Sequence, residues 1–191
     1  MARINKSRVR YGKLSDVIQK LNKKFSIKVG IIGSAASQKI EGAELTMAEL
    51  GAVHEFGARI AVTDKMRAFL NYMGIHLKKD TAEIEIPIRS FLREALLTPE
   101  GKKALQVWDA SEKEALIEYL NNDSISAEVL ANTIGKKGLD RVLNAFDTGG
   151  FGKWDPITEF TRKHRKGASD NPPLDSTGDL KSSISYEVKE L

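Results

Sequence analysis

The sequence predicts an α+β fold in which a small mixed or antiparallel sheet packs with several helices. Three patterns carry this prediction. Apolar and polar residues alternate near both ends of the chain, over 25–31 and 184–188, with the period of half-buried strands. Most of the chain between them has the period of amphipathic helices. A second pair of alternating segments encloses a helical one within residues 58–89, which predicts a ribbon-and-helix extension.

The composition fits one globular domain with extensions. The 191 residues are 41% hydrophobic and 29% charged, which is an ordinary balance. No apolar run approaches the roughly 20 residues that span a bilayer, and the basic start lacks an apolar signal segment. We therefore expect a soluble protein with no membrane partner. Because cysteine is absent, disulfides, thiolate nucleophiles and cysteine-ligated zinc are excluded.

Residues 1–13 form a predicted basic arm, and residues 14–191 form a single predicted α+β domain. Basic side chains come before any acidic one in the arm. Two interpretations stay open, a solvated tail or a contact with DNA or an acidic neighbour. The contact residues of the second interpretation are Arg3, Lys6, Arg8 and Arg10.

The domain begins with a predicted helix over 14–21 and a strand over 25–31, which is the natural partner of the last strand. After a turn-rich connector, a second helix is predicted over 45–56, with Gly57 ending it. Its expected apolar face is Leu45, Ala48, Ala52 and Phe56. His54 and Glu55 on this helix do not form a zinc motif, because Ala58 stands where the second histidine ligand is required.

The segment 58–89 is predicted to form a strand, a helix and a second strand. Isoleucines alternate with polar residues in both flanks, and the centre has a helical period. A stripe of methionine and aromatic residues is usually core. However, a short helix on a two-stranded ribbon buries little by itself, so an exposed interface is the alternative. The residues of that interface are Met66, Phe69 and Met73.

Helices are predicted over most of 90–146. Ser90 can cap the first through residue 97, and Thr98 followed by Pro99 starts a second, which we extend to residue 121. Paired carboxylates such as Asp109 and Glu112 are assigned to its solvated surface. A third helix follows to residue 146. Its internal Gly135 and Gly138 make it either locally weak or closely packed against a neighbour.

Residues 147–178 are predicted to be a glycine- and proline-containing loop that leads into the final strand. Pro172 and Pro173 argue against a regular helix over 153–175. A tryptophan beside a proline-bounded loop is a common way to pin an arm to its own domain or to a neighbour, so we expect a buried anchor. The predicted anchor residues are Trp154, Pro156 and Leu174. A basic run within the loop could face DNA or an acidic partner, or solvent; it comprises Arg162, Lys163, Arg165 and Lys166.

Three sequence passages resemble those of the tail-completion (neck) proteins of tailed bacteriophages, and more closely those of their virion-morphogenesis group. The C-terminal passage follows W-x-P-[LI]-x-x-x-T, a basic run, and P-L-x-x-T-G-x-L-x-x-S-I. The other two passages are G-A-V-H-E-F-G-A at 51–58 and I-P-I-R-S-F-L-R-E-A at 86–95. In the last, the family more often has R-P-F, so Ser90 is a departure that weakens the family's rigid turn.

The resemblance implies a ring, expected to be hexameric, at the junction of phage tail and head, with DNA passing through its lumen. The implied partners are other copies of the chain, a tail terminator or tail-tube protein, and a head–tail connector or head-completion protein. The implied location is the virion, after synthesis in the bacterial cytoplasm. No six-fold period is visible in the sequence itself.

Catalytic motifs are missing from the sequence: it has no nucleophile elbow, no phosphate-binding glycine loop and no metal-ligand spacing. We therefore expect a non-enzymatic structural protein without cofactors. Two alternatives stay open. One is a nucleic-acid-binding regulatory protein, which the basic segments favour, although no helix-turn-helix or RNA-binding motif is present. The other is a transient capsid-assembly factor, which has the same sequence features.

Overall fold

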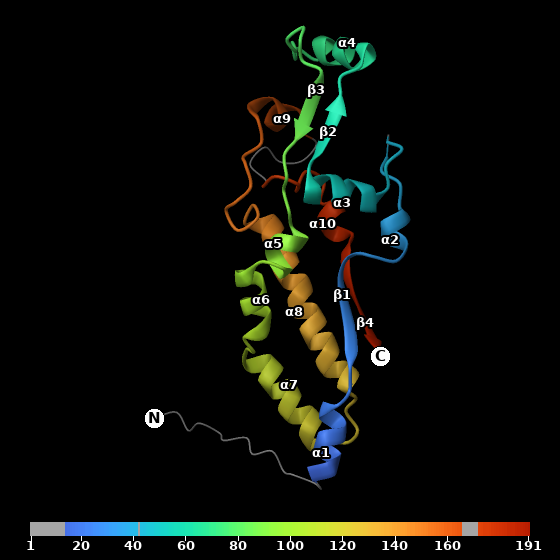
Figure 1. The fold of residues 1–191 in the computed structure, drawn as a ribbon, viewed down its shortest axis with the longest axis vertical. Coiled ribbons are helices and arrows are strands. Elements are labelled where there is room, and N and C mark those ends of the chain that lie inside the picture. The colour runs from blue at the N-terminus through green and yellow to red at the C-terminus, as the bar shows by residue number, and fades with distance from the viewer. Residues whose placement is uncertain (1–13, 42, 166–171) are drawn as a thin grey trace.

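The first and last strands of the fold pair with each other. Strand β1 (Phe25–Ile31) runs antiparallel to β4 (Ile184–Glu190), with Val29 opposite Tyr186. This computed structural model describes residues 14–41, 43–165 and 172–191. Figure 1 shows the two strands side by side near the middle of a long molecule. The expected pairing is confirmed, and antiparallel is the arrangement observed.

The longest helix, α8 (Ala127–Asp147), lies along this sheet and contacts both strands. Its glycines explain the close approach. A Cβ added at Gly135 would lie 2.4 Å from Cδ2 of Tyr186, and one added at Gly138 would lie 3.1 Å from Cγ2 of Val29. Close packing is therefore the correct one of the two alternatives for these glycines.

The core lies where α8 meets the segment around α5. The side chains of Phe91, Val142 and Phe146 are fully buried there, and the two phenylalanine rings lie 5.1 Å apart. The remaining helices of the body are α1 (Leu14–Leu21), α2 (Ser34–Ser37), α3 (Met47–Phe56), α5 (Leu92–Leu96), α6 (Pro99–Gln106), α7 (Ala110–Asn121), α9 (Glu159–His164) and α10 (Asp179–Ser182). The described residues therefore form an α+β fold with two small antiparallel sheets.

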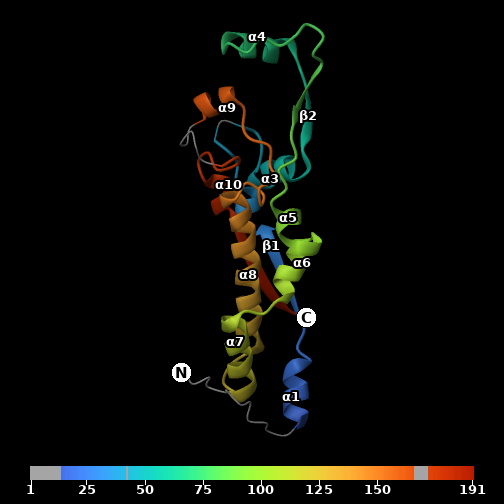
Figure 2. The same cartoon turned by 90° about the vertical axis from the view of Figure 1, so that its left-hand side faces the viewer.

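The predicted ribbon and helix are present. Strands β2 (Ala58–Ala61) and β3 (Glu83–Ile86) pair antiparallel, with Ile60 opposite Ile84, and α4 (Asp64–Tyr72) joins them. Thr63 caps α4 by accepting a hydrogen bond from the backbone N–H of Met66 at 3.2 Å. Figures 1 and 2 show the ribbon extending from one end of the body, with α4 at its tip. No residue of α4 is buried.

At the opposite end, α1 packs beside α7. The hydroxyl of Tyr119 donates to the backbone oxygen of Lys20 at 3.0 Å, and Lys20 Nζ donates to the oxygen of Tyr119 at 3.0 Å. The apolar stripe of α1 is nevertheless poorly covered, since Ile18 is 50% and Leu21 59% exposed. Both ends of the molecule therefore carry apolar side chains that the other described residues leave exposed, Ile18 and Leu21 on α1 and Phe69 and Tyr72 on α4.

The prediction of one helix from residue 98 to 121 is wrong. Helix α6 ends at Gln106 and α7 begins at Ala110. Asp109 caps α7 by accepting from the N–H of Glu112 at 3.0 Å, and the Glu112 carboxylate accepts from the N–H of Asp109 at 2.8 Å. This capping box starts a new helix. Glu112 is also buried and paired with Lys137 at 2.6 Å, so its assignment to a solvated surface is wrong too.

The loop predicted over 147–178 contains a short helix of six residues, α9, which the sequence pattern did not predict. Thr158 caps it by accepting from the N–H of Thr161 at 3.2 Å. Pro172 and Pro173 follow well after α9 ends, so the restrictions they place on the backbone do not reach it.

Helix α3 is present but turns a different face inward. Its buried residues are Met47, Gly51 and Glu55, whereas Phe56 of the predicted face is 63% exposed. The reason is close packing at Gly51, where an added Cβ would lie 2.4 Å from Cδ1 of Ile31. A glutamate is thus buried at a position that lies outside the predicted apolar face.

Candidate functional site

Glu55 joins α3 to the start of α5. Its carboxylate is buried and accepts a hydrogen bond from Ser90 Oγ at 2.6 Å and from Arg93 Nε at 2.9 Å. It also accepts from three backbone N–H groups, those of Phe91, Leu92 and Arg93, at 2.9, 3.0 and 3.0 Å. The first turn of a helix has such unpaired N–H groups, and a carboxylate there is favoured by the helix dipole. Glu55 therefore caps α5 from another helix.

The charge of Glu55 is maintained by these bonds. Burial alone raises the pKa of the carboxyl, but the hydrogen bonds from Ser90, Leu92 and Arg93 outweigh it and lower the pKa below its ordinary value. Ser90 contributes twice, because its hydroxyl also accepts from the N–H of Glu94 at 3.3 Å. The hydroxyl at this position, where the resembled family more often has proline, is thus part of the joint between α3 and α5.

The predicted anchor is only partly buried. The indole Nε1 of Trp154 donates to the backbone oxygen of Ser90 at 3.1 Å, and its ring lies edge-on to Phe146 at 5.9 Å between centroids. Leu174 also packs against the core. Pro156, in contrast, is exposed and so is not a buried anchor in this chain. The C-terminal segment is therefore held to its own domain by Trp154 and Leu174.

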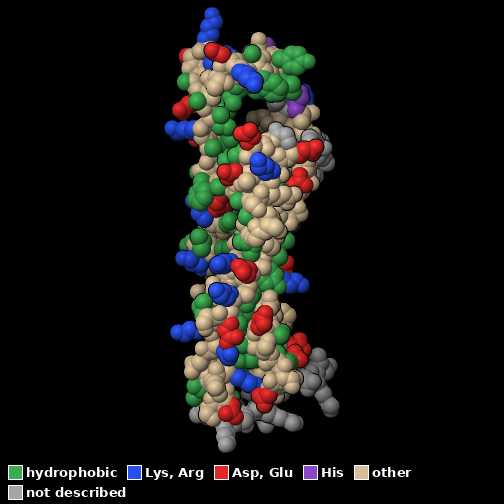
Figure 3. Space-filling view, turned by 90° about the vertical axis from the view of Figure 1, so that its right-hand side faces the viewer, with side chains coloured by type: hydrophobic (Ala, Val, Ile, Leu, Met, Phe, Trp, Pro, Cys, Tyr) green, Lys and Arg blue, Asp and Glu red, His purple; other side chains and the backbone are tan. Residues whose placement is uncertain are grey.

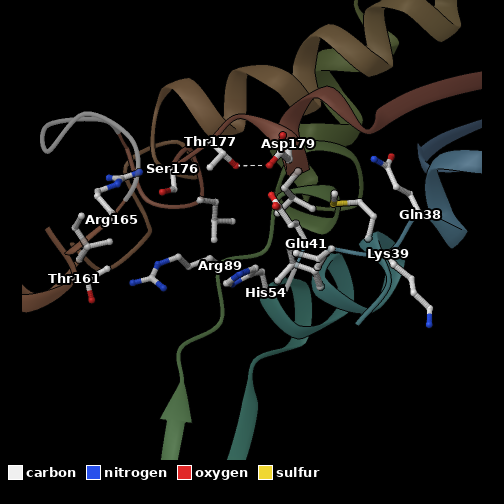
Figure 4. A pocket seen from close by; sticks show the side chains of 16 residues that line it. Gln38, Lys39, Glu41, His54, Arg89, Thr161, Arg165, Ser176, Thr177 and Asp179 are labelled. Carbon is white, nitrogen blue, oxygen red and sulfur yellow. Dashed lines mark hydrogen bonds between the residues drawn. The ribbon is translucent and has the colours of Figure 1, made fainter. Parts of the chain in front are cut away.

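A cavity of about 520 Å³ lies between α3, the segment after β3, and the chain from α9 to α10. Figure 4 shows its side chains converging from these segments. Leu50, Leu174 and Leu180 supply apolar lining, while His54, Arg89 and Arg165 supply nitrogen groups. The backbone N–H of Arg89 donates to the oxygen of His54 at 2.8 Å, which holds the two residues together.

Two buried nitrogen atoms at this cavity have no hydrogen-bond partner among the described residues, Nδ1 of His54 and Nε of Arg89. Burial, together with the positive charge of Arg89, lowers the pKa of His54 to about 4. Burial also lowers the pKa of Arg89, which the nearby Asp155 partly opposes. His54 is therefore neutral at pH 7, and Arg89 is the charged group of the pair.

The depressed pKa of His54 predicts a loss of stability in acid. Between pH 6.5 and about 4, the unfolded state binds a proton at His54 that the folded state does not, so stability falls as the pH falls through this window. This pKa difference lowers the free energy of unfolding by up to about 3 kcal/mol below the pH window and does not change it above the window. Urea unfolding at pH 7 and pH 4 should show that His54→Gln loses less stability than the wild type. His76→Gln, at an exposed histidine beyond α4, is the control; equal losses in His54→Gln and the wild type would contradict the prediction.

The three interface residues predicted on the ribbon differ in exposure. Met66 and Met73 are half-buried, whereas Phe69 is 59% exposed. Tyr72, on the same helix, is 87% exposed and was not among the predicted residues. Figure 3 shows apolar side chains on the surface at the tip of the ribbon.

A second apolar surface on the body was also missed by the sequence pattern. Phe56, Ile88 and Leu97 are 63%, 59% and 61% exposed. Phe56 and Leu97 line a groove of about 340 Å³ between α3 and α5. Neither residue could be recognised from periodicity, because Phe56 lies on the face expected to be buried and Leu97 follows the end of α5.

The basic residues predicted in the C-terminal segment differ in their exposure and contacts. Arg162 and Lys163 are exposed in the last turn of α9, and Lys163 pairs with Glu159 at 3.1 Å. Arg165 is half-buried, lines the cavity and donates to the oxygen of Pro172 at 3.3 Å. The other predicted contact residues lie outside the described residues; they are Arg3, Lys6, Arg8, Arg10 and Lys166.

Within residues 14–41, 43–165 and 172–191, no group of three or more histidine, aspartate or glutamate side chains is placed to hold a metal ion. None of the helices in the described part of the chain combines the length and apolar character that crossing a membrane requires. Comparisons of the chain with models of protein families, with curated proteins and with solved structures found no match.

Proposed function

We propose that this protein is a non-enzymatic structural subunit of a bacteriophage neck, where copies of it form a ring that completes the tail and joins it to the head. The assignment to a phage neck rests on the resemblance of the three sequence passages to tail-completion proteins. What supports self-assembly is one observation, the exposed aromatic side chains Phe69 and Tyr72 of the helix at the tip of a projecting ribbon.

Helix α4 has little to stabilise it within one copy. It has nine residues, none of them buried, and isolated helices shorter than about 12 residues are marginal in water. A two-stranded ribbon is likewise marginal without further packing. Phe69 and Tyr72 nevertheless place large aromatic surfaces in solvent. Such a patch on a projecting element is typical of a protein–protein contact.

A second copy of the same chain supplies a partner surface. The body carries Phe56 and Leu97 beside an apolar groove, away from the tip of the ribbon. A contact between two different surfaces of identical chains is head-to-tail, and it closes into a ring when the rotation between copies fits. The proposed number of six, and the adjoining tail terminator, tail-tube, connector or head-completion proteins, come from the resemblance alone.

In such a ring, the exposed Arg162 and Lys163 are candidate contacts with genomic DNA or an acidic partner protein. Phosphate contacts from lysine and arginine carry no sequence information, which suits a channel through which any DNA must pass. A transient capsid-assembly factor would share these features, and the presence of the protein in finished particles separates the two roles.

Replacing the tip aromatics should weaken assembly without unfolding the subunit. We expect wild-type protein to elute as a multi-copy particle in size-exclusion chromatography with light scattering. The double variant Phe69→Ser, Tyr72→Ser should be at least tenfold weaker in assembly. Its monomer should lose less than about 1 kcal/mol of stability, because exposed substitutions cost little. Lys65→Gln, at an exposed position on the same helix, is the matched control.

The same preparation distinguishes the regulatory alternative. A ring that is not retained on a duplex DNA column at physiological salt supports the neck proposal. A monomer or dimer whose DNA binding weakens steeply with added salt would instead identify a nucleic-acid-binding protein.

A further inference from the structure

We propose that the cavity between α3 and α9 binds the carboxylate of a ligand that also carries an apolar group, which is the chemistry of a peptide C-terminus. The guanidinium of Arg89 is the group that holds the carboxylate. This inference goes beyond the proposed function, and it does not depend on ring formation.

The size and lining of the cavity fit a small ligand of mixed character. Its volume of about 520 Å³ lies within the range of about 300 to 1,000 Å³ that is typical of ligand pockets. Leu50, Leu174 and Leu180 form apolar walls, and the polar groups come from separate segments of the chain. Apolar walls with a few convergent polar groups are the usual composition of such sites.

Arg89 has hydrogen-bond donors to spare. Among the described residues, its guanidinium makes one hydrogen bond, a long one of 3.3 Å from Nη2 to the oxygen of Asp155, and its Nε is unpartnered. In Figure 4 the guanidinium extends across the cavity toward Thr161 on α9 and Arg165, which follows that helix. Its planar fork matches a carboxylate through two parallel N–H···O bonds.

The charges around the cavity favour a monoanion. Among the described residues, its lining contains three basic side chains, Lys39, Arg89 and Arg165, and two acidic ones, Glu41 and Asp179, for a net charge of one positive. Asp179 accepts a hydrogen bond from the hydroxyl of Thr177 at 2.6 Å, and in Figure 4 both acidic groups lie away from the guanidinium of Arg89. A single carboxylate balances this charge, whereas a phosphate dianion exceeds it.

His54 adds a second reason for a polar ligand. Its Nδ1 is buried beside Arg89 without a partner among the described residues, and leaving the hydrogen bond of a buried group unmade is unfavourable. Both residues line the cavity, so a ligand bound there lies beside the side chains that carry these unpartnered nitrogens. Ligand binding would then satisfy groups that the protein alone leaves unpaired.

The test uses N-acetyl-leucine, a monocarboxylate with an apolar side chain, and observes the ¹⁵N–¹H resonance of Arg89 Nε by NMR. We expect saturable shifts of this resonance and of the His54 ring. Arg89→Gln should weaken binding at least tenfold, and Arg89→Lys, which keeps the charge but loses the planar fork, should also weaken it. Arg59→Gln on β2 removes an exposed arginine outside the cavity and should bind as the wild type does. Backbone spectra establish that each variant is folded.

Two further probes define the ligand chemistry. N-acetyl-leucinamide, which lacks the carboxylate, and inorganic phosphate should each bind at least tenfold more weakly than N-acetyl-leucine. The proposal is overturned if N-acetyl-leucine shifts neither resonance, if folded Arg89→Gln binds it unchanged, or if either of the other probes binds equally well. Repeating the titration on the Phe69→Ser, Tyr72→Ser variant keeps this result separate from the ring, because no residue of α4 lines the cavity.

Discussion

Replacing Glu55 with alanine is expected to lower the free energy of unfolding by about 3 to 5 kcal/mol. The substitution leaves three backbone N–H groups at the start of α5 without their acceptor and removes the partner of Arg93 Nε. Each buried donor left unpaired costs about 1 to 3 kcal/mol, and water entering the space offsets part of the sum. Since small domains are stable by only about 5 to 15 kcal/mol, the variant is close to unfolding.

Urea unfolding followed by circular dichroism measures this loss. Glu49→Ala is the matched control, because Glu49 is on the same helix but serves an exposed capping box with Thr46. It should cost about 1 kcal/mol, as lost caps do. A Glu55→Ala variant within about 1 kcal/mol of the wild type would show that Glu55 does not join α3 to α5.

The second large effect is expected at Gly150. Its φ of 67° is in the left-handed region, and an added Cβ would lie 2.1 Å from Nε1 of Trp154. Gly150→Ala therefore combines backbone strain of about 1 to 2 kcal/mol with displacement of the tryptophan from the core. We expect a total loss of about 3 kcal/mol or more, together with a change in Trp154 fluorescence.

Gly152→Ala separates these two contributions. Gly152 has a φ of 78° and nothing within 4 Å of the added Cβ, so only the strain remains. In a Trp154→Ala background, the cost of Gly150→Ala should fall to that of Gly152→Ala, because the indole is gone. Equal costs for the two glycines in the wild-type background would mean that Trp154 does not pack against Gly150 in solution.

Local patterns predicted much of the fold. The alternation at 25–31 and 184–188 was sufficient to pair the first and last strands, and residues 58–89 form the expected ribbon and helix. The pattern failed where polar side chains replace apolar ones in buried positions. Glu55 is buried because it caps a helix that begins 37 residues later, and no local periodicity can reveal such a partner. The capping box of Asp109 and Glu112, in contrast, can be recognised from the local sequence.

The candidate sites were predictable to different degrees. Trp154 and Leu174 could be proposed from the proline-bounded loop, and both pack against the core. The cavity could not be proposed, because His54, Arg89 and Arg165 come together only through the tertiary fold. Exposed Tyr72 was missed because a helical stripe shows which residues share a face and does not show whether that face is covered.

Electron cryo-microscopy of the purified protein tests the central claim most directly. The account predicts a closed ring in which α4 of each copy, with Phe69 and Tyr72, is covered by the body of the next copy. A particle population of single chains at tens of micromolar, or a ring in which α4 remains in solvent, would contradict it.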